Sequence, residues 1–133
     1  MGTMSTIQRI AVVFGVVYLL VGILGFIPGI TVESGTPGVG LLLGIFAVNL
    51  LHNLAHILFG IALVWAGMTS VANTVMVGRA LTVVFVLLII LGLVMPTMEA
   101  MPLNLPDTVL HLLSALVSGY LGFAAGARRS ATV

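Results

Sequence analysis

Four stretches of apolar sequence, each about as long as a bilayer-spanning helix, constrain the fold of this chain more than any other feature. Crossing the hydrocarbon core of a membrane takes about 20 helical residues. The stretches run from about Ile10 to Ile27, Leu50 to Met68, Val77 to Met95 and Leu105 to Ala125. The whole chain carries three acidic and four basic residues, too few for the surface of a water-soluble domain. We therefore predict an all-α fold, a four-helix transmembrane bundle in which residues 1–133 form a single integral membrane domain.

Composition also excludes several classes of function. The chain has no cysteine, which rules out disulfides, thiolate nucleophiles and cysteine metal ligands. A net charge of +1 is incompatible with the basic patch that a nucleic-acid partner requires. The lipid bilayer is the expected partner, and other membrane proteins or further copies of the chain remain as additional ones.

The few charged residues predict the orientation of the chain. The four arginines lie before the first span, at the start of the third and after the fourth, at Arg9, Arg79, Arg128 and Arg129. An even number of crossings separates these places, so all four face one side of the membrane, whereas Glu33 and Glu99 face the other. Because arginine-rich loops are retained in the cytoplasm, we expect both termini to be cytoplasmic.

The connection between the first two spans, residues 28–48, has two unlike halves. The first half is polar and rich in glycine and proline, which predicts turns. The second half, Val39 to Val48, is apolar and carries Gly40 and Gly44 in a Gly-x-x-x-Gly pattern. It is too short to span, so we expect this outer connection to hold a short apolar segment at the membrane surface or dipping into it. A continuous helix from Leu41 to Met68 is the alternative interpretation.

The two halves of the chain resemble each other. An asparagine, a histidine or aspartate three residues later and a histidine after four more occur twice, as Asn49, His52 and His56 and as Asn104, Asp107 and His111. The spans before them end in Leu24-Gly25 and Leu91-Gly92, each followed shortly by a proline. This predicts two parallel two-span repeats, about residues 7–68 and 77–126, related by a pseudo-two-fold axis along the membrane normal.

The histidines and the aspartate are the candidate functional residues. His52 and His56 lie on one face of a helix, and Asp107 and His111 lie on one face of another. Small residues continue both faces, namely Gly60, Gly67, Ser114, Ser118, Gly122 and Gly126. We therefore expect spans two and four to contact each other and to enclose the polar side chains.

Such a cluster suits a metal. Nitrogen and oxygen ligands from two helices would bind a divalent ion, and histidine also ligates haem iron. His52, His56, Asp107 and His111 are therefore the candidate metal ligands, and a divalent metal or haem is the candidate cofactor.

A structural role is the other interpretation of these residues. Asn49 and Asn104 stand where helices must begin, and asparagine is a preferred N-cap. Asp107 fits the acidic position of a capping box. With Asn53, these asparagines would form a structural polar cluster in which the histidines hydrogen-bond to each other, to Asn53 and to the backbone. Binding of a proton or a small solute is the third interpretation.

The sequence also resembles a known family. Two segments resemble the signature of the bacterial membrane family known as domain of unknown function 4383. The first runs from Leu43 to Gly60 and contains Val48-Asn49-Leu50-Leu51-His52-Asn53-Leu54-Ala55-His56, and the second is Pro102-Leu103-Asn104-Leu105-Pro106-Asp107 followed by Leu110-His111-Leu112. Leu50 departs from the family pattern, in which proline often follows the first asparagine. The resemblance extends from about Ile7 to Gly126. It implies four spans in a bacterial inner membrane and brings no established activity.

These observations favour a non-enzymatic accessory or binding protein of the bacterial plasma membrane. The sequence contains neither the nucleophile elbow of the hydrolases nor a phosphate-binding glycine loop. The alternative is a redox or transport component that binds a metal, haem or protons through the His/Asp cluster between spans two and four.

Overall fold

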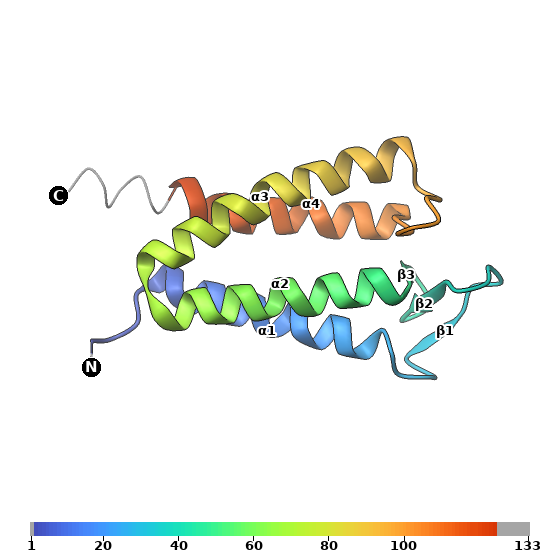
Figure 1. Cartoon of the computed structure of the whole chain (residues 1–133), viewed down its shortest axis with the longest axis horizontal. Coiled ribbons are helices and arrows are strands. Elements are labelled where there is room, and N and C mark those ends of the chain that lie inside the picture. The colour runs from blue at the N-terminus through green and yellow to red at the C-terminus, as the bar shows by residue number, and fades with distance from the viewer. Residues whose placement is uncertain (1, 125–133) are drawn as a thin grey trace.

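Four long helices account for most of the computed structural model, which describes residues 2–124 (Figure 1). They are α1 (Thr6–Leu24), α2 (Leu50–Thr69), α3 (Val71–Val94) and α4 (Leu105–Gly119), and a π-helical turn, η1 (Tyr120–Ala124), extends α4. Each of α1, α2, α3 and the combined α4–η1 is long and apolar enough to cross a membrane. The prediction of four helices of spanning length is confirmed. Ala125, with which the predicted fourth span ends, Gly126, Arg128 and Arg129 lie outside the described residues.

Capping residues explain why two helices begin earlier than the apolar runs. Ser5 caps α1, since its hydroxyl oxygen accepts from the Gln8 N–H and its own N–H donates to the Gln8 side chain. Ser70 caps α3 by accepting from the Asn73 N–H at 3.0 Å. Side-chain caps satisfy the free amides of the first helical turn, so the helices extend beyond the residues that hydropathy alone marks.

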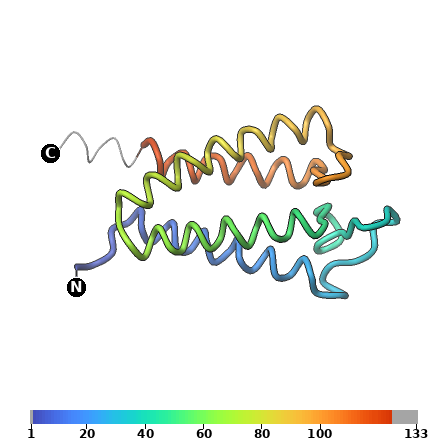
Figure 2. Tube along the Cα trace, in the orientation of Figure 1, coloured from blue at the N-terminus to red at the C-terminus, as the bar shows by residue number. Residues whose placement is uncertain are grey.

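The helices form two antiparallel hairpins, α1–α2 and α3–α4, which lie side by side (Figure 2). The junction of α2 and α3 lies at one end of the bundle together with the start of α1, and we call this the turn end. The long connections that follow α1 and α3 lie at the opposite end, which we call the strand end.

Glycines allow the closest helix contacts, and these occur within the hairpins. A Cβ added at Gly15 of α1 would lie 2.8 Å from the Gly60 carbonyl oxygen of α2, so neither position has room for a side chain. Gly67 likewise faces α1, and Gly122 faces Arg79 of α3. The expectation that the small residues bring spans two and four together is therefore wrong. The close contacts form between helices that are consecutive in the chain, α1 with α2 and α3 with α4–η1. Helices α2 and α4 meet through larger side chains.

The connection 28–48 contains a three-stranded antiparallel sheet, so the all-α prediction is wrong for this segment. The strands are β1 (Thr31–Glu33), β2 (Gly40–Leu42) and β3 (Phe46–Val48), with β2 in the middle. The predicted short apolar segment therefore forms strands β2 and β3. Three of its residues, Leu42, Ala47 and Val48, are each under a tenth exposed.

A tight turn explains why no continuous helix runs from Leu41 to Met68. Leu43 and Gly44, between β2 and β3, have φ angles of 54° and 76°. The Ile45 N–H donates to the Leu42 carbonyl at 3.1 Å and closes the turn. A right-handed helix requires negative φ at every residue, so the chain reverses here and α2 begins only at Leu50.

The outer faces of the helices are apolar. Leu58 on α2, Val83 on α3 and Leu116 on α4 are each about three-fifths exposed. A water-soluble protein buries most such side chains, whereas lipid solvates them. The exposed faces therefore agree with the four helices of spanning length.

Candidate metal centre

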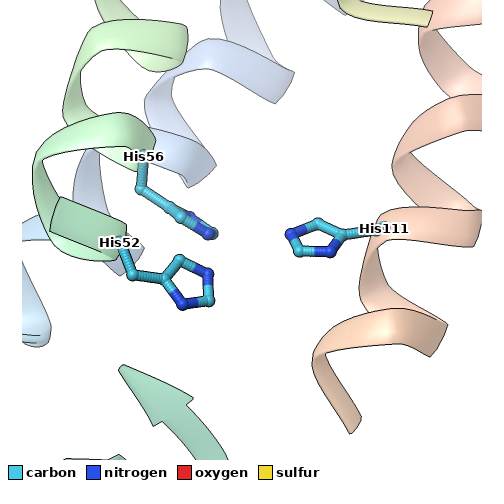
Figure 3. A group of neighbouring side chains, drawn as sticks. All are labelled: His52, His56 and His111. Atoms are coloured by element: carbon cyan, nitrogen blue, oxygen red, sulfur yellow. The ribbon is translucent and has the colours of Figure 1, made fainter. Parts of the chain in front are cut away.

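Three histidines from two helices meet inside the bundle. His52 and His56 extend from α2 and His111 extends from α4, and the three rings point toward one another (Figure 3). One ring nitrogen from each can be chosen so that all three lie within 4.8 Å of one another. The side chains are 2%, 5% and 2% exposed, so the group is shielded from both water and lipid.

Aromatic rings hold two of the imidazoles in position. The Tyr18 ring of α1 stacks on His56, with centroids 4.7 Å apart and planes 11° apart. The Phe85 ring of α3 lies nearly parallel to His111, with centroids 6.0 Å apart. All four helices therefore contribute to the site, and ring packing positions His56 and His111.

A hydrogen bond between the two hairpins also supports the site. The Tyr18 hydroxyl and the Ser114 hydroxyl lie 2.5 Å apart, which joins α1 to α4 beside the histidines. Both side chains are buried. The bond satisfies the phenol, which would otherwise be an unpaired polar group in the interior.

The histidine nitrogens themselves are poorly satisfied. Within residues 2–124, both ring nitrogens of His52 and the Nδ1 atoms of His56 and His111 are buried without a hydrogen-bond partner. The backbone of Ala47 and Pro102 faces the His52 ring, but no bond of good geometry results. Each buried polar group left unpaired costs about 1–3 kcal/mol, so native proteins contain few of them.

Asp107, the fourth predicted ligand, is not part of the three-histidine group among the described residues. Its carboxylate accepts from the Asn104 N–H at 3.2 Å, and the Asn104 side chain accepts from the Asp107 N–H. These two bonds form the capping box that the sequence predicted at the start of α4. The start of α4 therefore engages this carboxylate.

The predicted polar cluster of asparagines is spread over three places. Asn49 caps α2 by accepting from the His52 N–H at 2.9 Å, as predicted, and Asn104 caps α4. Asn53 lies against Gly25, where an added Cβ would overlap its amide.

The two capping asparagines also bind across the hairpins. The Asn49 amide donates to the Ala100 carbonyl at 2.9 Å, and the Asn104 amide donates to the Ile45 carbonyl at 2.7 Å. Each asparagine thus ties its own helix to the connection that precedes the other one.

The three rings fit a single metal ion. An ion bound tetrahedrally with nitrogen ligands at about 2.0–2.1 Å places them about 3.3 Å apart. The chosen nitrogens lie within 4.8 Å of one another, so small ring rotations would close the site around an ion. A haem bound by two of the rings would overlap the third. The residues present therefore fit a divalent ion and do not fit a haem.

The chain matches a known protein family. The family described as domain of unknown function 4383 matches residues 8–124. The chain belongs to this family. No curated protein and no solved structure is significantly similar to it. Membership confirms the resemblance noted in the sequence and assigns no activity to the histidines.

Sequence reasoning did not predict the aromatic walls of the site. Tyr18 and Phe85 each stand seven residues, or two helical turns, before the paired glycines Gly25 and Gly92. The internal alignment therefore contained the signal, because it pairs the two rings that flank His56 and His111 in the fold.

Proposed function

We propose that the chain is a non-enzymatic binding protein of the bacterial plasma membrane whose three buried histidines hold a divalent transition metal. The observation that carries this proposal is the set of buried, unpaired ring nitrogens on three imidazoles that point at one another. A metal ion supplies the partner that these nitrogens lack.

The donor set favours particular metals. Neutral imidazole suits zinc, copper, nickel and iron, whereas magnesium and calcium prefer oxygen ligands. Three protein nitrogens leave a fourth coordination position for water or another small ligand. Aromatic rings and Ser114 lie around the histidines, and the buried Asp107 carboxylate is engaged in the capping box of α4, which supports a binding or accessory role.

Two parallel repeats are part of the proposal, and three pairs of matching contacts support them. The donor–acceptor pairs Asn49–Ala100 and Asn104–Ile45 correspond under the internal alignment, because each acceptor stands four residues before the other asparagine. The stacked pairs Tyr18–His56 and Phe85–His111 correspond in the same way. So do the close contacts of Gly25 with Asn53 and of Gly92 with Thr108. The histidine group lies where the two halves meet.

A purely structural cluster is the second candidate. The stacking of Tyr18 on His56 and of Phe85 near His111 would hold the rings without an ion. If the cluster is purely structural, its unpaired nitrogens lower the free energy of unfolding. Binding of a proton or a small solute at the histidines is the third candidate.

Elemental analysis of the purified protein tests the proposal. After equilibration with Zn²⁺ and removal of excess metal, the wild type should hold one ion per chain. His56→Leu and His111→Leu should each lose it, whereas Phe85→Leu, which alters the wall beside His111 and removes no ligand, should retain it. A wild type without bound metal, or histidine variants that bind as the wild type does, would reject the metal centre.

A further inference from the structure

A hollow at the strand end lies between the two long connections. It has a volume of about 560 Å³ and is lined by residues from both connections, among them Ser34, Thr36, Thr97, Glu99 and Asn104. The Asn104 amide, which joins the second connection to the first through Ile45, lies in its wall. The hollow is therefore a feature of the assembled bundle and needs both hairpins.

The hollow and the histidine group border on the same two residues. Ala47 and Pro102 line the hollow, and the backbone of the same two residues faces the His52 ring. Both are buried, and His52 stands in the first turn of α2, the turn nearest the strand end. A single layer of chain thus separates the hollow from His52, whose two ring nitrogens are unpaired within the described residues.

The path from the opposite end is filled. Between the histidines and the turn end lie large buried side chains in mutual contact, namely Leu63, Leu81, Phe85 and Leu121, with Phe59 packed against them. Protein interiors pack as densely as organic crystals. A hydrated cation would have to displace this core to arrive from the turn end.

We propose that a divalent cation reaches the three-histidine site through this hollow, passing between Ala47 and Pro102, and that His52 is the first ligand it meets. The inference rests on the proposed metal site and adds the route and the side of the bundle from which the ion comes. The Glu99 carboxylate in the wall attracts the cation, because a negative group in a concave surface raises the local concentration of positive ions.

The absence of native cysteine allows a direct test by blocking the hollow. Thr97→Cys places a thiol in its wall, and Ala72→Cys places one on an exposed position of α3 near the turn end. Each purified protein, in lipid nanodiscs, is coupled to a bulky maleimide, and Co²⁺ is added. The visible absorption of tetrahedral Co²⁺ gives both the rate and the final extent of binding.

The labelled Thr97→Cys protein should bind Co²⁺ at least about tenfold more slowly than its unlabelled form, with the same final absorption. The labelled Ala72→Cys protein should bind at the unlabelled rate. A Thr97 label without effect on the rate, or an Ala72 label that slows binding, would overturn the route. Wild-type protein that never takes up Co²⁺ would instead reject the metal site itself.

Glu99→Gln provides a second variant without a bulky group. It should slow Co²⁺ association by about twofold or more at low ionic strength, and the difference should vanish in high salt because salt screens the attraction. If the Thr97 label abolished binding altogether, an unchanged association rate in Glu99→Gln would reject the hollow as the route.

Discussion

At the scale of single residues, His52 and Asp107 explain why the site is asymmetric. Both stand three residues after a capping asparagine, at matching positions of α2 and α4. The carboxylate of Asp107 can accept from the Asn104 N–H and so completes a capping box. The His52 ring makes no such bond within residues 2–124, and both of its nitrogens stay unpaired. The start of α4 therefore uses this position for a cap, whereas α2 places an imidazole there beside two more.

His52→Phe should affect the metal-free and the metal-bound protein in opposite directions. In the metal-free protein it removes two unpaired nitrogens, which should raise the free energy of unfolding by about 1–3 kcal/mol. In Zn²⁺ it should lower stability relative to the wild type, which gains about 2.7 kcal/mol at a metal concentration of 100 times Kd. Unfolding in mild detergent, with EDTA and with Zn²⁺, measures both. An equal loss under the two conditions would contradict a role in metal binding.

At the scale of elements, the turn between β2 and β3 carries local strain. Leu43 has φ 54°, a value that costs a residue with a Cβ about 1–2 kcal/mol, and Gly44 has φ 76°. The β-turn from Leu42 to Ile45 lies within this three-residue loop, and β-turns with positive φ at both central positions favour asparagine and glycine there. Leucine at the first position is therefore unfavourable for the turn, and nearly two-thirds of its surface is exposed.

Substitutions in this turn should shift stability in opposite directions. Leu43→Asn should raise the free energy of unfolding by up to about 1 kcal/mol, because asparagine tolerates the left-handed conformation. Gly44→Ala should lower it by about 1–2 kcal/mol. Thermal unfolding of both variants in the same detergent gives the comparison. If Leu43→Asn destabilised the protein, the exposed leucine would be an anchor in the membrane surface rather than a strained turn residue.

The elements differ in how far the sequence could predict them. The spans were predictable because lipid demands long apolar helices, and the caps at Asn49 and Asn104 were predictable from local chemistry. The three-residue strands were not, because Gly40-x-x-x-Gly44 fits a helix contact as well as a hairpin until the φ of Gly44 is known. The meeting of His52, His56 and His111 was predictable from their helix faces, whereas the capping box at the start of α4 engages Asp107; that these residues bind a metal stays a prediction.

At the scale of the whole molecule, the histidine group exists only where the hairpins meet. His52 and His56 come from the first hairpin with the Tyr18 ring, and His111 comes from the second with the Phe85 ring. Neither hairpin alone contains all three histidines. The reciprocal bonds of Asn49 and Asn104 join the hairpins at the strand end, so the same contacts that assemble the bundle complete the site and its hollow.

The orientation of the bundle decides which compartment the hollow faces. Arg9 and Arg79 lie toward the turn end, and Glu33 and Glu99 lie in the connections at the strand end. Since arginines are retained in the cytoplasm, we predict that the turn end is cytoplasmic and that the hollow opens to the outside of the plasma membrane.

Two single cysteines in the cysteine-free chain test this orientation. Thr36→Cys lies in the wall of the hollow and Ala72→Cys near the turn end, and both positions are exposed. A membrane-impermeant maleimide added to intact cells should label position 36 and leave position 72 unlabelled until the membrane is permeabilised. Because both positions are exposed and position 72 becomes labelled after permeabilisation, a difference in labelling reports the side of the membrane. Labelling at position 72 alone would show that the bundle has the opposite orientation. Cations would then reach the histidines from the cytoplasm.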